Sequence, residues 1–313
     1  MSSVAVVAEM VGAPVSLTAI DVDVPAPGPG EVTIDVRAAG VNLADFMVCL
    51  GAIANAKRFP AHPLGYEVAG VISAIGPDTA IASGGGAVGD PVLAFRVRGG
   101  YTDRLNARAD DVYRKPDTLT FPEAANLLLC GTSASKMLRV TGVTAGDTVL
   151  LHAASGGTGV SILQQARMVG ARVIGTCGKD NFEVVRRFGG EPVEYGEGLA
   201  ERVRDLAPDG IQVALDCAGT DEALDVSFAL VQNRRRIMTC CAYPRAFDED
   251  MEFSIGTWPG AAERAARADI IELAAAGKLV VPVAATHPLS DAADVLNFLS
   301  QRHPGGGKHA LVP

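Results

Sequence analysis

The sequence predicts an α/β fold in two parts: a β-rich domain, and a domain in which strands and helices alternate around a doubly wound parallel sheet. Two observations lead to this prediction. Extended segments rich in Val, Ile and Thr, divided by Gly and Pro, fill roughly the first 120 residues. From Asp147 onward, short apolar segments alternate with helical segments of about ten residues, as expected for parallel strands covered on both faces.

Extended segments dominate the β-rich part. The first three are VAVVAE, PVSLTAIDVDV and EVTIDVRAAGVN, with the turn-forming PAPGPG before the third; YEVAGVISAIG and GDPVLAF follow Gly65. Near Thr120 the pattern changes, because Thr120, Pro122 and Glu123 together are typical of a helix start. Two C-terminal segments, VVPVAATHPL and HALVP, are expected to be strands that return to this domain.

The alternating part begins with the strand TVLLHAA. The expected helices are VSILQQARMVG, NFEVVRRFG, LAERVRDLA and DEALDVSFALV, and the strands between and after them are RVIGT, PVEY, IQVALDCAG and RIMTCCA. One more extended segment is expected near 251–257, with no helix between Cys241 and that segment. A long helix, AAERAARADIIELAAAG, is predicted to follow it.

Composition excludes several classes of function. The chain has 27 basic and 36 acidic residues, and its net charge of −9 repels phosphate backbones, so nucleic-acid binding is not expected. No apolar stretch reaches the roughly 18–20 residues of a membrane span, and the N-terminus, with Glu9 and no basic leader, is expected to be a strand and not an export signal. A cytoplasmic protein without a membrane partner is expected. The six cysteines form no CxxC pair, so reduced thiols are expected and a structural zinc site is not.

A Gly-rich turn between a strand and a helix is the most informative motif. It consists of Ala154, Ser155, Gly156, Gly157, Thr158 and Gly159. Gly156 lets the backbone approach a diphosphate, Gly159 allows the helix to pack closely on the strand, and the helix N-terminus supplies N–H groups and partial positive charge. Ala154 replaces the first glycine of the GxGxxG pattern, so an ordinary βα turn is the alternative. The context favours a Rossmann-type domain that binds a dinucleotide.

The end of the next strand decides between NADH and NADPH. A domain specific for NAD carries a carboxylate about 20 residues after the fingerprint, where it holds the ribose 2′-hydroxyl. Here the strand ends in Thr176, Cys177 and Gly178, and Lys179 follows, which would attract a 2′-phosphate. NADPH is therefore the expected cofactor, and NADH is less favoured. Asp180 would restore a preference for NADH if it turned inward, and a solvated loop charge is the alternative for Lys179.

Six strings occur in a fixed order along the chain. They are GVNLAD at 40–45, PLGYEVAG at 63–70, GDPV at 89–92, GTSA at 131–134, AASGGTG at 153–159 and GKHALV at 307–312. Together they resemble the quinone oxidoreductase (zeta-crystallin-like) branch of the medium-chain dehydrogenase/reductase superfamily, over nearly the whole chain. The resemblance implies a GroES-like catalytic domain from 1–122 and 259–313 and a Rossmann NADP(H)-binding domain from 123–258. It also implies an active site in the cleft between them and a homodimer.

The resemblance also implies roles for residues that contact the cofactor. Ser133 would hydrogen-bond the carboxamide in place of the usual Thr, and Tyr195 resembles an aromatic residue near the adenosine phosphate. The nicotinamide ribose would be bordered by Cys217, Ala218 and Gly219. A hydroxyl that only caps the interior of its own helix is the structural alternative for Ser133.

The catalytic residues implied are Asn42, Asp45 and Tyr66. Asn42 and Asp45 would line the cleft near the nicotinamide; a turn residue and a local helix cap are the structural alternatives. Zinc-dependent relatives carry Cys at the Asn42 position and His at the Tyr66 position, so no metal is expected. Tyr66, water or a ribose hydroxyl would donate to the developing enolate, and packing is the alternative for Tyr66. Glu67 is expected to be a structural hydrogen-bond or ion-pair partner.

The implied reaction is hydride transfer from NADPH to a small quinone, enone or other conjugated carbonyl. Met47 and Cys49 stand where relatives often carry Tyr and Arg, which favours a more apolar site. An enoyl thioester or polyketide intermediate is therefore an alternative substrate. A non-catalytic NADPH-binding structural or sensing protein is the alternative of another class.

Overall fold

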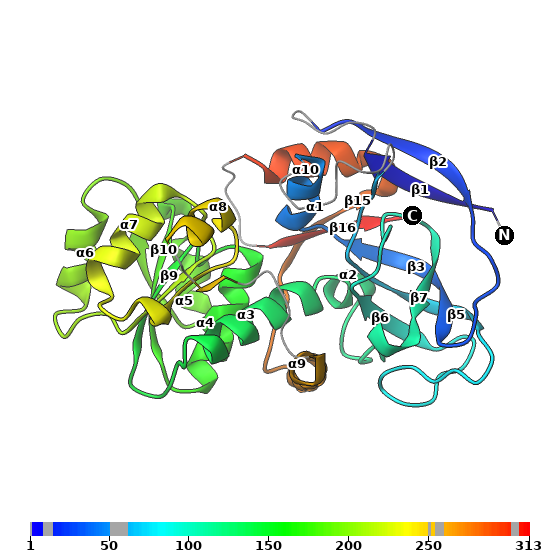
Figure 1. Ribbon diagram of the computed structural model, residues 1–313, viewed down its shortest axis with the longest axis horizontal. Coiled ribbons are helices and arrows are strands. Elements are labelled where there is room, and N and C mark those ends of the chain that lie inside the picture. Colours follow the sequence, from blue (N-terminus) through cyan, green and yellow to red (C-terminus); the bar gives the residue numbers. More distant parts are fainter. Residues whose placement is uncertain (1, 9–14, 51–61, 250–251, 254–259, 302–306) are drawn as a thin grey trace. The chain divides into compact units, whose positions relative to one another are not determined.

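The computed structural model describes residues 2–8, 15–50, 62–249, 252–253, 260–301 and 307–313 (Figure 1). They divide into two compact units. The first contains the described residues up to Leu129 and those from Val281, apart from Gly307; the second contains those between Cys130 and Val280. This division differs from the predicted one, which placed the breaks at 122/123 and 258/259.

A seven-stranded sheet lies at the centre of the first unit. Its strand order is β15-β16-β3-β5-β6-β8, with β7 paired to β3, and the β15–β16 pair is parallel. The bounds are β3 Glu31–Gly40, β5 Glu67–Ile75, β6 Pro91–Phe95, β7 Arg104–Arg108, β8 Val112–Arg114, β15 Val283–Pro288 and β16 Lys308–Val312. A smaller sheet, β2-β1-β4, joins β1 Ser2–Ala8, β2 Leu17–Asp23 and β4 His62–Pro63. Every strand expected for this domain is present, because alternating β-branched residues fill its core.

Helices complete the first unit. They are α1 Leu43–Cys49, α2 Phe121–Ala124 and α10 Ala292–Leu299, with 3-10 turns at η2 Ala109–Asp111 and η5 Leu289–Asp291. The predicted helix start is confirmed, since the Thr120 backbone N–H donates to the Glu123 carboxylate at 2.8 Å. Sequence analysis did not predict α10, which packs its buried residues Ala292, Val295 and Leu296 against the core of this unit.

The second unit is built on a six-stranded parallel sheet with the order β11-β10-β9-β12-β13-β14. The strands are β9 Thr148–His152, β10 Arg172–Cys177, β11 Glu191–Glu194, β12 Val213–Asp216, β13 Ile237–Thr239 and β14 Glu252–Phe253. The helices are α3 Leu128–Val140, α4 Gly157–Met168, α5 Phe182–Arg187, α6 Leu199–Leu206, α7 Asp221–Leu230, α8 Tyr243–Asp248 and α9 Gly260–Ala275, with 3-10 turns η3 Lys179–Asn181 and η4 Arg234–Arg236. The predicted alternation of strands and helices is confirmed.

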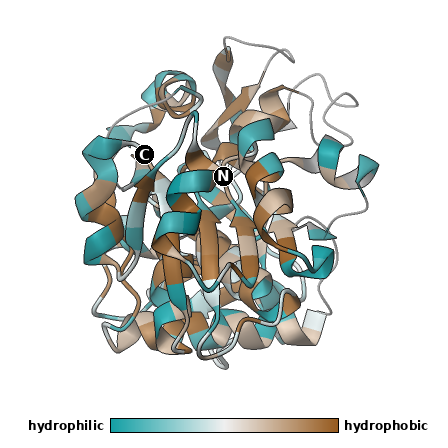
Figure 2. Ribbon diagram, turned by 90° about the vertical axis from the view of Figure 1, so that its left-hand side faces the viewer, coloured by the Kyte–Doolittle hydropathy of each residue, from teal (hydrophilic) through white to brown (hydrophobic). Residues whose placement is uncertain are grey.

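The central strand of this sheet is buried on both faces. Val149, Leu150 and Leu151 have no exposed surface; Val149 and Leu151 belong to one hydrophobic cluster and Leu150 to another. Alternate side chains of a strand point to opposite faces, so each cluster fills one face of the sheet. Figure 2 shows this unit with brown, hydrophobic strands surrounded by helices that mix brown and teal. The apolar run 149–151 therefore fixes β9 at the middle of the sheet.

Helix α9 lies in the second unit, whereas the predicted boundaries assign it to the first. Gly131 of α3 leaves room for it, since an added Cβ would stand 2.9 Å from a methyl group of Ile270. Arg139 forms an ion pair with Asp269 at 3.2 Å. Just beyond α9, the Val280 N–H donates to the Gln164 side chain at 2.8 Å. These contacts with α3 and α4 place 260–280 in the second unit.

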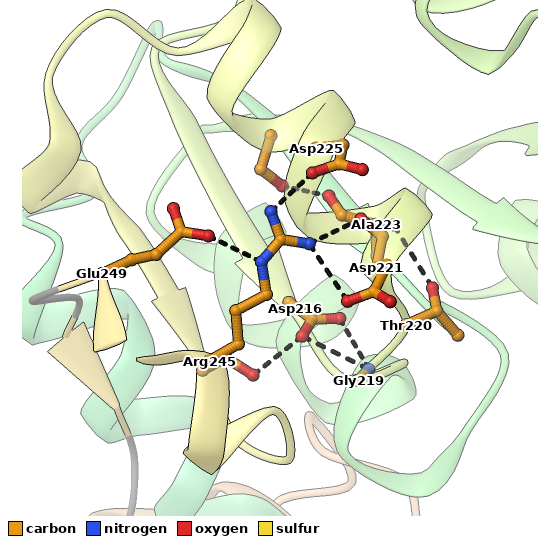
Figure 3. A network of polar contacts seen from close by, with 10 residues as sticks. Asp216, Gly219, Thr220, Asp221, Ala223, Asp225, Arg245 and Glu249 are labelled. Atoms are coloured by element: carbon orange, nitrogen blue, oxygen red, sulfur yellow. Dashed lines mark hydrogen bonds and ion pairs between the residues drawn. The ribbon is translucent and has the colours of Figure 1, made fainter. Parts of the chain in front are cut away.

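The short helix α8 corrects the prediction that no helix lies between Cys241 and the last extended segment. Arg245 holds it against α7, because its guanidinium contacts Asp221 at 3.2 Å and Asp225 at 2.5 Å; it also pairs with Glu249 at the end of α8, at 2.6 Å (Figure 3). A helix of six residues is marginal by itself, so these tertiary contacts stabilise it. The contacts with Asp221 and Asp225 join residues 24 and 20 positions apart, which a local pattern does not reveal.

Replacing Arg245 by Met tests this role. We expect the free energy of unfolding to fall by about 1 kcal/mol, because three ion pairs are lost but their carboxylates stay solvated. Arg139→Met, which removes a single exposed pair, is the control and should cost less than about 0.5 kcal/mol. Urea unfolding at low salt and in 1 M NaCl measures both. Equal effects of the two substitutions at low salt would contradict the assignment.

One buried ring lies at the end of β9. The His152 ring has its Nε2 3.1 Å from Ser227 Oγ and its Nδ1 3.4 Å from Thr176 Oγ1. Burial lowers the pKa of His152 to about 4, although the nearby Asp216 carboxylate acts in the opposite direction. The ring is therefore neutral at pH 7, and both of its nitrogens lie near a hydroxyl group at the end of β9, where the Gly-rich turn begins.

This lowered pKa predicts a dependence of stability on pH. The unfolded chain binds a proton at His152 below about pH 6.5 and the folded chain does so only near 4. The part of the folding stability that depends on a neutral His152 ring is therefore fully present above pH 6.5 and is lost as the pH falls toward 4. Between pH 7 and 4 we expect the wild type to lose up to about 3 kcal/mol more than His152→Gln. Urea unfolding across this range would contradict the account if both proteins gave parallel curves.

Candidate functional site

The Gly-rich turn leaves the end of β9 and leads directly into α4. Ala153 adopts a left-handed conformation with φ +53°, and Ala154 donates its backbone N–H to Thr176 O at 2.9 Å, which anchors the turn to β10. Helix α4 begins at Gly157 with Gly156 as its N-cap, and neither a side-chain cap nor an acidic residue compensates its first turn. The first N–H groups of an α-helix have no intrahelical acceptor. This end therefore presents donors and partial positive charge to an anion.

The two glycines that the sequence singled out differ in their surroundings. A Cβ on Gly159 would stand 2.4 Å from Ala153 O, so only glycine allows α4 to pack this closely on the turn. A Cβ on Gly156 would meet its nearest atom, again Ala153 O, at 3.4 Å. The backbone at Gly156 is thus open to a ligand. These observations fit the diphosphate of a dinucleotide.

Most of the predicted cofactor residues lie at one edge of the parallel sheet. The turn follows β9, Lys179 follows β10, Tyr195 follows β11, and Cys217 follows β12. The carboxyl ends of parallel strands lie at the same edge, so the fold gathers these segments. From β9 the chain adds β10 and β11 on one side and then returns to add β12 on the other side, so the strand order reverses between β9 and β12. In open α/β sheets, ligands bind at this switch point.

Asp216 fixes the turn that contains Cys217, Ala218 and Gly219. Its fully buried carboxylate accepts a hydrogen bond from Gly219 N at 3.0 Å (Figure 3). It also accepts from Ala218 N at 2.8 Å and from the Thr239 hydroxyl at 2.7 Å. Gly219 has φ +70°, where glycine is favoured. Sequence analysis did not single out Asp216, although a carboxylate that ends the apolar strand IQVALD was an available signal.

Ser133 lies in α3 and is half-buried. Its neighbour Thr132 is buried, and its hydroxyl has no hydrogen-bond partner among the described residues. A buried hydroxyl without a partner is costly, and such groups often mark a ligand contact. Thr132 is therefore a second polar candidate in the GTSA string, and the sequence alone gave no reason to prefer it.

Lys179 and Asp180 are both exposed in the turn η3. The Lys179 ammonium forms an ion pair with Glu194 at 3.2 Å, a contact that the sequence did not predict. Tyr195 is partly buried and packs against the hydrophobic cluster around Leu150. Lys179 is thus a paired charge at the carboxyl edge and not an isolated one.

The first unit contains a separate buried polar network that includes Asn42 and Asp45. Asn42 is the N-cap of α1, and its backbone N–H donates to Asp45 at 2.9 Å. The Asp45 carboxylate also accepts from Gly65 N at 3.1 Å and from the Tyr101 hydroxyl at 3.0 Å. These contacts match the structural interpretations of both residues. Burial raises the pKa of Asp45 to about 6, although the hydrogen bonds favour its charged form.

Glu67 and Lys308 fix the orientation of the Asn42 side chain. Asn42 Nδ2 donates to Glu67 at 3.0 Å, and the Lys308 ammonium donates to Asn42 Oδ1 and to Val41 O, the latter at 2.7 Å. Glu67 also accepts from Leu129 N at 2.9 Å, which confirms that it is a structural partner. Burial raises the pKa of Glu67 to about 7, against the opposing charge of Lys308. Lys308 belongs to the GKHALV string, but no local pattern indicates its contact with Asn42.

Tyr66 lies just before β5 and is partly buried against the core of the first unit. Burial, together with the negative charge of Asp45, raises the pKa of its hydroxyl to about 12. The hydroxyl therefore stays protonated at neutral pH and is a donor. Cys49, where relatives often carry a polar residue, is buried in α1, and burial raises its pKa to about 11.

Among the residues that the structure describes, no three or more His, Cys, Asp or Glu side chains are grouped as ligands for a metal ion. None of the helices defined there has the length and hydropathy that a membrane span requires.

Comparison with known proteins agrees with this architecture. The family described as "Alcohol dehydrogenase GroES-like domain" matches residues 28–117, and the family described as "Zinc-binding dehydrogenase" matches residues 157–257. The predicted fold class, a GroES-like domain with a Rossmann-type parallel sheet, is therefore confirmed.

Three relatives illustrate the similarity. A mycobacterial protein solved in complex with NADPH is 28% identical, with a TM-score of 0.85, and the match covers 99% of this chain and 100% of that one. The quinone oxidoreductase of Pseudomonas syringae pv. Tomato DC3000 is 26% identical, with a TM-score of 0.85 and coverage of 99% and 100%. The spectinabilin polyketide synthase system protein NorB of Streptomyces orinoci is 34% identical over 211 residues, which are 65% of this chain but 9% of that protein. This chain thus spans less than a tenth of the synthase.

The two family matches, the Gly-rich turn with its free helix end and the structural relatives together assign the fold and its lineage. The chain is an oxidoreductase of the medium-chain dehydrogenase/reductase superfamily, and its structural relatives include quinone oxidoreductases.

Proposed function

We propose that this protein is a zinc-independent oxidoreductase that uses NADPH to reduce a quinone, an enone or another conjugated carbonyl. The observation that carries the proposal is the uncompensated N-terminus of α4 beside the open backbone of Gly156. The similarity to a mycobacterial protein solved with NADPH and to a quinone oxidoreductase supports it.

The dinucleotide would be held by residues of the second unit. The amides of 155–159 would bind the diphosphate, Lys179 and Tyr195 would contact the adenosine end, and Ser133 with 217–219 would contact the nicotinamide end. Once bound, NADPH supplies the hydride that reduces the acceptor. The protein's own part is to orient the two reactants and to stabilise the charge that develops on the acceptor oxygen.

In the first unit we assign that stabilising role to Tyr66. Its hydroxyl is protonated at neutral pH because its pKa is about 12, so it can donate a hydrogen bond to a carbonyl oxygen. Asn42 and Asp45 would shape the substrate site through the network with Glu67, Lys308 and Tyr101. Asn42 and Tyr66 stand where zinc-dependent relatives carry Cys and His. This difference supports chemistry without zinc.

A second candidate substrate is an enoyl thioester or a polyketide intermediate. The identity of 34% to a segment of a polyketide synthase favours it, as do Met47 and the buried Cys49, which make the region around α1 less polar. A cytoplasmic homodimer without nucleic-acid or membrane partners completes the proposal. It rests on the acidic composition and on the resemblance to the family.

Gly156→Ala tests dinucleotide binding. The added methyl has room in the free protein, so we expect an unchanged midpoint of thermal unfolding and about a tenfold loss of NADPH affinity, because the methyl obstructs the approach of the diphosphate. Gly260→Ala is the control, because Gly260 also has room for a methyl group at the start of a helix. It should leave both the unfolding midpoint and the NADPH affinity unchanged. Calorimetric titration with NADPH gives the affinities. If Gly156→Ala binds NADPH as tightly as the wild type does, the assignment of this turn to the diphosphate is contradicted.

Tyr66→Phe tests the proposed donor on a panel of quinones, enones and enoyl-thioester mimics. With the best acceptor we expect kcat to fall about 100-fold while the Kd for NADPH is unchanged, as for the loss of one donor to a developing oxyanion. Tyr113→Phe on β8 controls for the loss of a buried hydroxyl. Turnover only with thioesters would select the second substrate class. Tight NADPH binding without turnover on any acceptor would instead indicate a non-catalytic binding protein.

A further inference from the structure

Lys179 and Glu194 form an ion pair at the carboxyl edge of the second unit's sheet. Their charged atoms are 3.2 Å apart, and the side chains are 73% and 39% exposed. The pair is a consequence of strand register. Strands β10 and β11 are parallel with Cys177 opposite Glu194, so Glu194 ends its strand beside the turn that carries Lys179.

This position is where a dinucleotide-binding sheet distinguishes the two cofactors. The strand that follows the Gly-rich βα unit carries, at its carboxyl end, the groups that contact the 2′ position of the adenosine ribose. In this chain that strand is β10, which pairs with β9. The sequence offers Lys179 there and no carboxylate, but the fold brings a carboxylate in from the neighbouring strand.

The charges near Lys179 do not favour a 2′-phosphate as strongly as the lysine alone would. Glu194 compensates it directly, and Asp180 is exposed next to it in the same turn. The nearby Arg202 guanidinium donates to the backbone oxygens of Glu194, Gly196 and Glu197, at 2.8, 3.0 and 2.7 Å. Arg202 thus fixes the segment after β11, and its N–H groups are bound to backbone carbonyl oxygens.

We propose that Glu194 is a specificity-determining residue that competes with the 2′-phosphate of NADPH for Lys179. Bound NADPH must displace Glu194 from Lys179 or tolerate a carboxylate beside its phosphate, whereas NADH, which has a 2′-hydroxyl, meets no such repulsion and finds an acceptor. Glu194 therefore lowers the ratio of NADPH affinity to NADH affinity, which Lys179 raises. The inference rests on the proposed binding of a dinucleotide to this unit.

The test is the affinity of each dinucleotide, measured by calorimetric titration of the full chain with NADPH and NADH in separate experiments. In Glu194→Gln we expect NADPH to bind about fivefold more tightly and NADH to change less than twofold, since one exposed charge pair is removed. Adding Lys179→Ala to that variant should abolish the gain. Glu191→Gln is the matched control: it removes the same charge at the opposite end of β11, where Glu191 pairs with Arg172, and should alter neither affinity.

Each outcome decides the inference. A rise in the NADPH-to-NADH affinity ratio in Glu194→Gln and in Glu194→Ala, but not in Glu191→Gln, supports it. An unchanged ratio in variants that bind both dinucleotides overturns it and leaves the proposed function intact. Absence of binding to either dinucleotide in the wild-type protein overturns both.

Discussion

The dinucleotide site proposed for the second unit depends on the free N–H groups at the start of α4. A helix end without a side-chain cap or an acidic first turn leaves donors unsatisfied and partial positive charge uncompensated. Three features hold this end in place: the fully buried strand β9, the anchoring of Ala154 to β10, and the close approach that only glycine permits at 159. A diphosphate satisfies both the donors and the charge.

In the first unit the main energetic cost is the burial of several ionisable groups close together. Asp45 and Glu67 have raised pKa values because they are removed from water, and Lys308, Tyr101 and backbone N–H groups partly offset that cost. Each polar atom of the Asn42 amide has a partner, so its orientation is fixed. Networks of this kind rigidify the backbone around them, which is a requirement for a site that must orient a substrate.

Much of the fold was predictable from the sequence, because alternating apolar residues mark strands of the first unit and continuous apolar runs such as 149–151 mark the parallel strands of the second. The Gly-rich turn was equally clear, since its residues act within one βα unit. Helix α8 was not predictable, because Arg245 stabilises it through partners on α7. The ion pair of Lys179 with Glu194, and the contact of Lys308 with Asn42 from the other end of the chain, likewise depend on strand pairing or distant segments. Sequence motifs indicate the candidate site, and tertiary contacts such as the Lys179–Glu194 pair determine the charge there.

The central claim is that the amides of 155–159 bind the diphosphate of a nicotinamide dinucleotide. The most direct measurement is an NMR titration of the ¹⁵N-labelled protein with NADPH, which follows the backbone amide shifts of the whole chain. The account predicts that the largest shifts occur in 155–159, with smaller shifts at Lys179 and at Gly219. Saturable shifts that leave 155–159 unaffected, or no shifts at all, would contradict it.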